Sequence, residues 1–235
     1  MPNLAPQILY EDNMLLVINK PAGILSQKDI SESSDMLTIT KEYLKIKYNK
    51  KGNVFLGLVH RLDRNTSGVM CFAKNSKAAS RLSLQFRTNT VIRTYHILVR
   101  GKPKKLSGIL THNLVKDTKN NMVHISPNGV QAKLIYKTIK TFTLKTDILP
   151  DTVRNISLIE VVLSTGKPHQ IRAQFGHSGL PIIGDIKYGI ASPLINRPAV
   201  HAYSLALDHP VTKETLTFKV SYPKDFDRVI TRISD

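Results

Sequence analysis

Cysteine and long apolar runs are both scarce in this sequence. Its only cysteine, Cys71, cannot form an internal disulfide, and it lies in an apolar run at 69–72. We therefore expect a buried thiol in a reducing compartment, the cytoplasm. No apolar run approaches the roughly 18 residues needed to span a bilayer, and the N-terminus has no signal-peptide pattern. These absences argue against disulfide-rich secreted proteins and membrane-spanning proteins.

Acidic residues are also few. The chain has 17 Asp and Glu against 34 Lys and Arg, which gives a formal net charge of +17. Because each phosphate that a Lys or Arg neutralises releases a counterion, this sign favours a polyanionic partner, with nucleic acid as the leading candidate. Lysines spread over the surface for solubility alone are the simpler alternative. A membrane partner is not indicated, since no basic amphipathic helix carries bulky aromatics on its other face.

Motifs for metals and nucleotide cofactors are absent. The eight histidines are scattered, and the sequence has neither an HExxH motif nor a Cys/His cluster. "TGKP" at 165–168 is not a phosphate-binding P-loop, because Val161 stands where that motif needs glycine and Pro168 where it needs Ser or Thr. No GxGxxG fingerprint occurs either, so we expect no cofactor and no metal.

The chain shows no repeat, low-complexity tract or linker, and 41% hydrophobic residues suffice for a core, so we expect one domain over 1–235. A helix should start at Met36 after the N-cap Asp35, with one apolar face formed by Met36, Ile39, Tyr43 and Ile46. A second helix should follow Asn75. Strands are expected at 13–19, 54–59, 68–74, 91–99, 130–139, 156–164, 199–207 and 215–221. Many strands without regular βαβ alternation predict an α+β fold: a mixed, largely antiparallel β-sheet with a few short helices and a catalytic cleft.

The stretch "HRLDRNTSG" at 60–68 places Asp63 between Arg61 and Arg64, on a loop between two expected strands. Nearby positive charge favours the ionised carboxylate. A persistently ionised aspartate suits a nucleophile, a base or a stabiliser of positive charge. The local pattern alone favours the alternative, an ordinary Arg/Asp pair in a surface turn closed by Gly68.

Two further segments carry candidate residues. In "STGKPHQIRAQFGHSGLPIIGDIKYG" at 164–189, Pro168 suits a helix start, and Arg172 would project from that short helix. A capped helix whose His169 and Arg172 bond backbone carbonyls is the alternative. In "VIRTYHILV" at 91–99, Arg93 and Tyr95 share a strand face with apolar residues, so this strand could border a cleft.

"HRLDRNTSGVMCFAKN" resembles the HRLDxxTSG signature of the RluA-type RNA pseudouridine synthases. Five more blocks of this family occur in the family's order: "YEDNMLLVINKPAG", "RTYHILVRG", "TGKPHQIR", "GDIKYG" and "HAYSLALDHP". The six blocks run from residue 10 to residue 210 and so cover nearly the whole chain.

The resemblance implies an isomerase that breaks the N1–C1′ bond of a uridine in RNA, turns the uracil and rejoins it through C5, without cofactor or metal. Asp63 matches the essential aspartate, which either attacks C1′ or removes a sugar proton. Tyr95 matches the tyrosine that packs on the base, and Arg172 the arginine that pairs with the aspartate. Chemistry at C1′ and C5 needs a flipped-out uridine. Residues expected to contact RNA are Arg61, Arg64, Arg93, Lys167 and His169.

The resemblance also sets expectations for the rest of the site and for the target. Uracil leaves as a delocalised anion, so one carboxylate suffices, and Asp185 is expected to be a structural turn residue. Lys167 and Gln174 depart from the family pattern, which usually has arginine and histidine there. We expect no N-terminal S4 RNA-binding domain, a monomer, and a target in ribosomal RNA, transfer RNA or both. Alternatives are an RNA-binding or RNA-remodelling protein that keeps the fold, and a basic binder of other polyanions.

Overall fold

The protein divides into two compact units. The computed structural model describes residues 5–29, 33–143, 155–189 and 191–234. The first unit comprises residues 1–93 and 202–221, and the second comprises residues 94–201 and 222–235. The chain passes from one unit to the other within strand β5 (Ile92–Arg100) and returns within strand β10 (Val200–Asp208). A single catalytic domain over 1–235 stays a prediction.

The sheet of the first unit has a fully buried central strand. It contains β1 (Gln7–Glu11), β2 (Leu15–Lys20), β4 (Ser67–Ala73), β10 and β11 (Thr215–Lys219), with the short β3 (Gly57–Leu58) beside β4. β4 lies between β2 and β10, and all of its residues are buried. Cys71 on β4 is fully buried, as expected, and its burial raises the pKa of the thiol to about 12.

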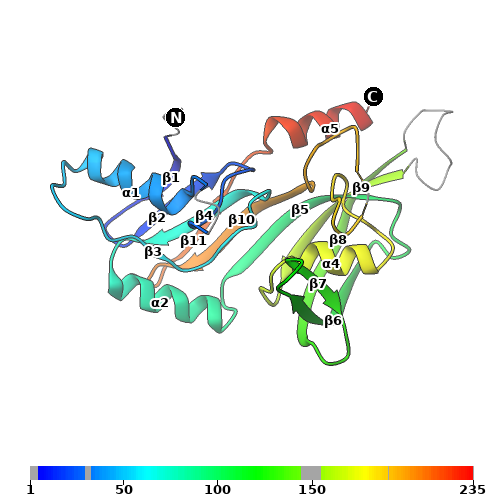
Figure 1. Ribbon diagram of the computed structural model, residues 1–235, viewed down its shortest axis with the longest axis horizontal. Helices are drawn as coiled ribbons and strands as arrows, with labels where there is room; N and C mark the ends of the chain where they lie inside the picture. The colour runs from blue at the N-terminus through cyan, green and yellow to red at the C-terminus, as the bar shows by residue number, and fades with distance from the viewer. Residues whose placement is uncertain (1–4, 30–32, 144–154, 190, 235) are drawn as a thin grey trace. The chain divides into compact units, whose positions relative to one another are not determined.

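Two capped helices lie along this sheet (Figure 1). α1 (Met36–Lys47) and α2 (Ser76–Arg87) begin after Asp35 and Asn75, whose side chains accept backbone N–H groups. The N-cap role of Asp35 was predicted, and the second helix was expected after Asn75. α2 contributes Ala78 and Leu82 to the core around β4. α1 buries Met36, Thr40 and Leu44, whereas Ile46, expected on the apolar face, is 72% exposed. That expectation was wrong because the buried face follows i, i+4, i+8 spacing, and Ile46, two residues after Leu44, lies on another side of the helix.

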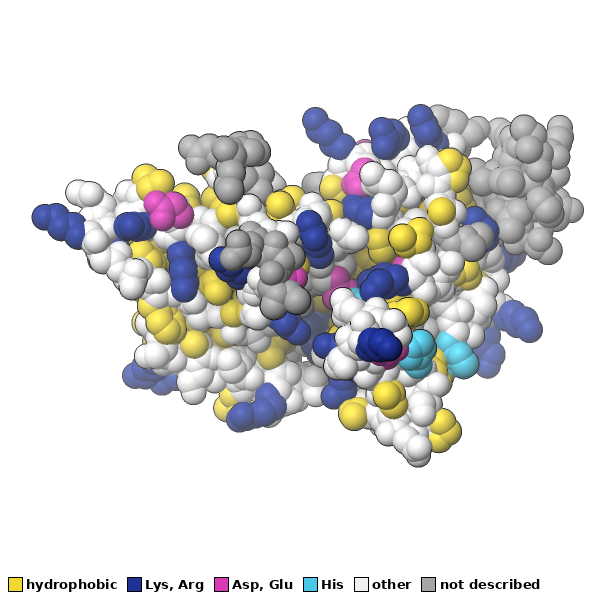
Figure 2. Space-filling view, viewed as in Figure 1, with side chains coloured by type: hydrophobic (Ala, Val, Ile, Leu, Met, Phe, Trp, Pro, Cys, Tyr) yellow, Lys and Arg dark blue, Asp and Glu magenta, His cyan; other side chains and the backbone are white. Residues whose placement is uncertain are grey.

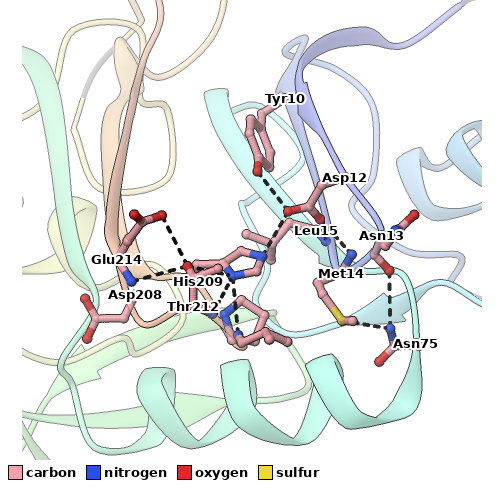
Figure 3. A network of polar contacts seen from close by, with 12 residues as sticks. Tyr10, Asp12, Asn13, Met14, Leu15, Asn75, Asp208, His209, Thr212 and Glu214 are labelled. Carbon is pink, nitrogen blue, oxygen red and sulfur yellow. Dashed lines mark hydrogen bonds and ion pairs between the residues drawn. The ribbon is translucent and has the colours of Figure 1, made fainter.

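A polar network joins the two ends of the first unit's sequence (Figure 3). Asp12, in the turn between β1 and β2, accepts hydrogen bonds from Tyr10 Oη and from the backbone N–H of Leu15. His209 Nε2 lies 2.9 Å from the Asp12 carboxylate. His209 Nδ1 accepts from the backbone N–H of Thr212, so the proton is on Nε2 and is donated to Asp12. The blocks "YEDN" and "HAYSLALDHP" are therefore neighbours in space.

The sheet of the second unit follows the order β5, β9, β8, β6, β7. Its strands other than β5 are β6 (Ser107–Asp117), β7 (Met122–Ile125), β8 (Val130–Thr143) and β9 (Asn155–Leu163). All pairings among them are antiparallel, and β8 shifts register between Thr138 and Lys140. The long pairing of β8 with both β6 and β9 gives this unit a rigid central ribbon.

Two helices complete the second unit. α4 (Gln170–His177) buries Ile171, Ala173, Gln174 and Phe175, and the Phe175 ring meets Tyr136 of β8 edge to face. α5 (Lys224–Ser234) buries Phe226, and Tyr222 just before the helix stacks on that ring. Among the helices of the described residues, none has the length and apolar character needed to cross a bilayer.

The predicted α+β class, with a largely antiparallel sheet and a few short helices, is confirmed. Every pairing of named strands that we describe is antiparallel, and the bridge between Leu25 and Asp35 is parallel. Sequence patterns missed β1, β6, β7 and α5, and the strand predicted at 54–59 shrinks to β3. The patterns failed where strands carry polar and apolar residues without alternation, as β6 does.

Candidate active site

A buried lysine holds the loop that carries Asp63. Lys20, at the end of β2, is fully buried, and its Nζ donates to three backbone carbonyls, those of Pro21, Arg64 and Thr66. Two of these carbonyls, those of Arg64 and Thr66, lie within "HRLDRNTSG" just after Asp63, at 3.1 and 2.9 Å from Nζ. The three carbonyl oxygens stabilise the buried ammonium group. Their hydrogen bonds offset the free-energy cost of removing its charge from water.

The segment after β2 forms a second clamp on the same loop. Ser26 Oγ donates to the carbonyl of Leu62 at 2.7 Å and accepts the N–H of Leu62 at 3.0 Å. Gly23, in the "KPAG" turn at φ +88°, donates its N–H to the carbonyl of Arg64. Arg64 Nε returns a hydrogen bond to the Gly23 carbonyl. Residues 20–26 therefore fix the backbone on both sides of Asp63.

The first residue of the motif, His60, is a structural acceptor. Its Nε2 accepts the backbone N–H of Cys71 at 3.0 Å, and its ring stacks on Phe86 of α2 with 4.6 Å between centroids. Burial and the positive charge of Arg93 lower the pKa of His60 to about 3. His60 is therefore neutral at physiological pH and available as an acceptor.

The glycine that ends the motif permits close packing. Gly68 has φ +121°, and a Cβ there would lie 2.1 Å from the carbonyl oxygen of Ala202 on β10. No other residue fits between these two strands. The glycine at the end of the motif is thus required by its contact with Ala202 in the "HAYSL" block.

Asp63 itself is half-buried, and it lies in a turn in which its carbonyl accepts the N–H of Thr66. The neighbouring Arg61 and Arg64 are both exposed. The loop thus fixes the main chain of Asp63 and leaves two cationic side chains at the surface beside it.

Arg93 differs from these exposed arginines. Its side chain is only 9% exposed, and Nη2 donates to Asn89 Oδ1 at 3.2 Å. Its charge acts on His60, as the lowered pKa of that ring shows. This internal position was not predicted. Because Arg93 and Tyr95 share a strand face with apolar residues, the sequence suggested that this strand borders a cleft.

In the second unit, Tyr95 lies on β5 opposite Val161 of β9 and is 9% exposed. Lys167 is exposed, and its backbone N–H donates to Gln170 Oε1. Gln170 also donates through Nε2 to the carbonyl of Lys133 on β8. The "TGKPHQ" turn is therefore tied to the sheet by Gln170, a residue that sequence reasoning did not single out.

Arg172 has a buried partner in the second unit. Its Nε and Nη2 each donate to one oxygen of Asp185 at 2.7 Å, and the Asp185 side chain is fully buried. Asp185 Oδ1 also accepts the backbone N–H of Lys187. Asp185 is thus a turn residue, as expected, and it also holds Arg172, which sequence reasoning missed.

Tyr188 holds Arg172 from another side. The guanidinium carbon of Arg172 lies 5.0 Å from the Tyr188 ring centroid. Tyr188 Oη accepts the N–H of Val123 and is also hydrogen-bonded to Nδ1 of His169, at 2.8 Å. His169 stands at φ +49° just before α4. Asp185 and Tyr188 both lie in the block "GDIKYG". This block was the sequence signal that could have identified the residues that hold Arg172.

Gln174, which departs from the family pattern, is fully buried. Its Nε2 lies 3.2 Å from the carbonyls of Leu110 and Ala132 and 3.1 Å from His112 Nδ1. Its Oε1 has no hydrogen-bond partner among the described residues. Gln174 therefore joins α4 to β6 and β8 from inside the unit.

A family model described as RNA pseudouridylate synthase matches residues 14–177. The chain belongs to this family. It is 33% identical over 220 residues to an uncharacterized RNA pseudouridine synthase, YhcT, of Bacillus subtilis, covering 93% of this chain and 69% of that protein. It is 32% identical to ribosomal large subunit pseudouridine synthase C of Vibrio vulnificus, covering 95% and 68%. The RluA-type assignment made from the six blocks is thereby confirmed.

Solved structures agree on the fold of this RNA pseudouridine synthase. Human RNA pseudouridylate synthase domain containing 4 superposes with a TM-score of 0.78 at 23% identity, covering 97% of this chain and 93% of that chain. As a member of this family, the protein is an isomerase that acts on uridine in RNA.

The candidate residues of the synthase fall in both units. Asp63, Arg61, Arg64 and Arg93 belong to the first unit, and Tyr95, Lys167, His169 and Arg172 belong to the second. The pairing of Asp63 with Arg172 and the roles of all eight residues stay predictions. The described residues contain no group of three or more His, Cys, Asp or Glu that could hold a metal ion.

Proposed function

We propose that this synthase converts a uridine of large-subunit ribosomal RNA into pseudouridine, with Asp63 as the group that acts on the ribose. The observation that carries the proposal is the clamping of the Asp63 loop by Lys20 and Ser26. A catalytic group must be held in place before substrate binds, and this loop holds its main chain from both sides. The Vibrio vulnificus relative, named for the large ribosomal subunit, supports the choice of target. Transfer RNA is the second candidate.

The chemistry needs one ionised carboxylate. The N1–C1′ bond breaks, C5 bonds to C1′ and gives up its proton, and N1 regains a proton, so the product is an isomer. Asp63 either attacks C1′ or removes a sugar proton, and both routes need the carboxylate form. The exposed Arg61 and Arg64 on either side of Asp63 attract phosphate.

Other roles follow from the family pattern. Tyr95 packs on the flipped uracil, and Arg172 pairs with Asp63. Arg61, Arg64, Arg93, Lys167 and His169 contact the RNA, with Arg93 acting from its buried position through charge. The Asp185 carboxylate and the Tyr188 ring support this role of Arg172, because they fix the direction of its guanidinium group.

The test is a map of pseudouridines in ribosomal and transfer RNA from cells that lack the gene and are complemented with the wild-type or the Asp63→Asn protein. We expect one or a few large-subunit sites that appear with the wild type and vanish with Asp63→Asn. Asp227→Asn, a change at an exposed carboxylate of α5, is the matched control and should restore the wild-type map. An identical map for Asp63→Asn would overturn the proposal. RNA binding without isomerisation by the pure wild-type protein would favour the RNA-binding alternative.

We also propose that the enzyme works as a monomer in the cytoplasm and needs neither cofactor nor metal. Its buried lone cysteine supports a reducing compartment. Light scattering of the pure protein should give the mass of one 26.3 kDa chain. Activity should survive extensive dialysis against a chelator, and loss of activity there would contradict the metal-free proposal.

A further inference from the structure

The end of α1 and the loop that follows it form an exposed basic segment in the first unit. Residues 45–55, "KIKYNKKGNVF", contain four lysines and no acidic residue. Every side chain from 45 to 53 is exposed, and so is Phe55. We call residues 45–55 the lysine–aromatic segment. On the face of the molecule drawn in Figure 2, Lys and Arg side chains clearly outnumber acidic ones.

The backbone of the segment has a defined shape. Tyr48 donates its N–H to the Leu44 carbonyl, and Asn49 adopts the left-handed conformation at φ +48° that ends a helix. The N–H of Lys50 then donates to the carbonyl of Lys45 at 3.0 Å. This bond folds the chain back, so the backbones of Lys45 and Lys50 are adjacent.

The aromatic side chains are exposed and held in place. Tyr48 is 47% exposed, yet its Oη donates to Glu11 at 2.7 Å. The ammonium groups of Lys47 and Lys74 lie 5.4 and 5.1 Å from the Tyr48 ring centroid. Phe55 is 52% exposed and lies close to Gly57 of β3, where an added Cβ would be 3.5 Å from the ring. The exposed Phe55 ring is therefore the one suited to stacking on a base, whereas the anchored Tyr48 ring already has two ammonium groups over it.

We propose that the lysine–aromatic segment is a second RNA contact of the enzyme, separate from the loop of Asp63, which takes an unpaired stretch of RNA. A base stacks on Phe55, while Lys45, Lys50 and Lys51 contact the phosphates. Interleaved cations and exposed aromatic rings are the combination that binds single-stranded nucleic acid. The membership of the chain in an RNA-modifying family supports RNA as the polyanion.

An acidic protein or a lipid surface fits the segment less well. An acidic peptide would use the lysines and would leave Phe55 without a planar partner. A membrane would need an apolar face, but Ile46, Tyr48 and Phe55 are separated by lysines and polar residues along the segment. Both alternatives are outcomes of the tests below.

The binding test uses a 20-nucleotide RNA of alternating adenosine and cytidine, which has no uridine for the active site. Phe55→Ala should weaken binding about 5- to 100-fold, as expected for loss of one base stack. Lys50→Gln with Lys51→Gln should lower the slope of log Kd against log salt by about 1.4, since each phosphate contact contributes about 0.7. Lys116→Gln with Lys219→Gln, which removes two exposed lysines elsewhere, is the matched control and should change the slope by less than half as much.

Equal effects of the two lysine pairs would overturn the proposal, because they would show a general charge effect. An unchanged affinity of Phe55→Ala would overturn the stacking role. Tighter binding to phosphatidylglycerol vesicles or to polyglutamate than to the RNA, with the same dependence on Phe55, would assign the segment to a membrane or a protein instead.

The absence of tryptophan from the chain allows a direct probe of stacking. Phe55→Trp introduces a single indole, whose fluorescence should be quenched when the single-stranded RNA saturates the protein. A blunt duplex of the same length should quench less, because its bases are already stacked. Val130→Trp, at a 59% exposed position of the second unit, is the control and should not respond. Bound RNA without quenching at position 55 would contradict the proposal.

Failure of this proposal and failure of the proposed function are distinguishable. With a uridine-containing RNA, Phe55→Ala should raise KM and leave kcat unchanged, since the segment takes no part in the chemistry. A wild-type protein that isomerises nothing would refute the proposed function without affecting the binding results above. A fall in kcat with an unchanged KM for Phe55→Ala would contradict the second RNA contact.

Discussion

The loop of Asp63 and the surroundings of Arg172 are held in opposite ways. The loop is fixed through its main chain, by Lys20 Nζ and Ser26 Oγ. Arg172 is fixed through its side chain, by the buried carboxylate of Asp185 and the ring of Tyr188. Main-chain anchors tolerate changes of side chain within the loop, whereas a side-chain anchor depends on one partner.

This difference has an energetic consequence. Removal of one member of a buried ion pair leaves an uncompensated charge, which costs about 3–5 kcal/mol. Removal of a donor to backbone carbonyls leaves neutral acceptors, which costs about 1–3 kcal/mol for an unsatisfied group. The second unit should therefore be more sensitive to a single substitution at its anchor than the first.

Asp185→Ala should have the largest effect. It leaves the Arg172 guanidinium without its carboxylate, so we expect a loss of about 3–5 kcal/mol in the free energy of unfolding and a lower kcat. Urea unfolding and tritium release from C5-labelled uridine measure the two quantities. Asp225→Ala is the matched control, because Asp225 forms a similar two-contact pair with Arg197, at 2.6 and 2.9 Å. That variant should lose stability and keep kcat, and equal losses of kcat would contradict a special role of Asp185.

Lys20→Met should come next. The methionine fills the buried space, but three carbonyls lose their donor, so we expect a loss of about 2–3 kcal/mol in the free energy of unfolding. Because the loop of Asp63 is released, kcat should fall more than tenfold while RNA affinity changes little. Lys219→Met, at an exposed position outside the lysine–aromatic segment, is the control. An unchanged kcat in Lys20→Met would show that the clamp does not position Asp63.

Glu11→Gln tests an anchored carboxylate of the first unit. Burial would raise the pKa of Glu11, but hydrogen bonds from Lys47, Lys74 and Tyr48 outweigh it and lower the pKa to about 2. A carboxyl with a lowered pKa stabilises the folded state fully above its unfolded value of about 4.5, and this stabilisation is lost as the pH falls toward 2. The wild type should exceed Glu11→Gln by about 1–2 kcal/mol at pH 7, and the difference should shrink below pH 4.5. Urea titrations at several pH values measure it, and a difference independent of pH would refute this assignment.

Gln174→His, which restores the family's usual residue, should have the smallest effect. The amide Nε2 can donate to both Leu110 and Ala132, whereas one ring nitrogen donates a single hydrogen bond. We expect a loss of about 1 kcal/mol in the free energy of unfolding, with activity retained. A stabilised variant would mean that the unpartnered Oε1 costs more than the lost hydrogen bond.

Local sequence patterns predicted several elements well. Asp35 was identified as an N-cap, and a helix was expected after Asn75, because a short side-chain acceptor and an apolar helical pattern are local signals. The buried Cys71 followed from its apolar run. By contrast, Ile46 was placed on the wrong face and β6 was missed, because periodicity in α1 and in β6 is weak and tertiary contacts decide which side is buried.

The sequence by itself determined the family, because six ordered blocks of specific residues identify RNA pseudouridine synthases without any coordinates. It also indicated Asp63 as the residue to test. Only the tertiary structure decided how these residues are held, since Lys20, Ser26 and Asp185 act on partners 13 to 46 positions away in the chain. Such long-range hydrogen bonds leave no periodic pattern in the sequence. The same reason hid the anchored ring of Tyr48, which depends on Glu11, 37 positions away.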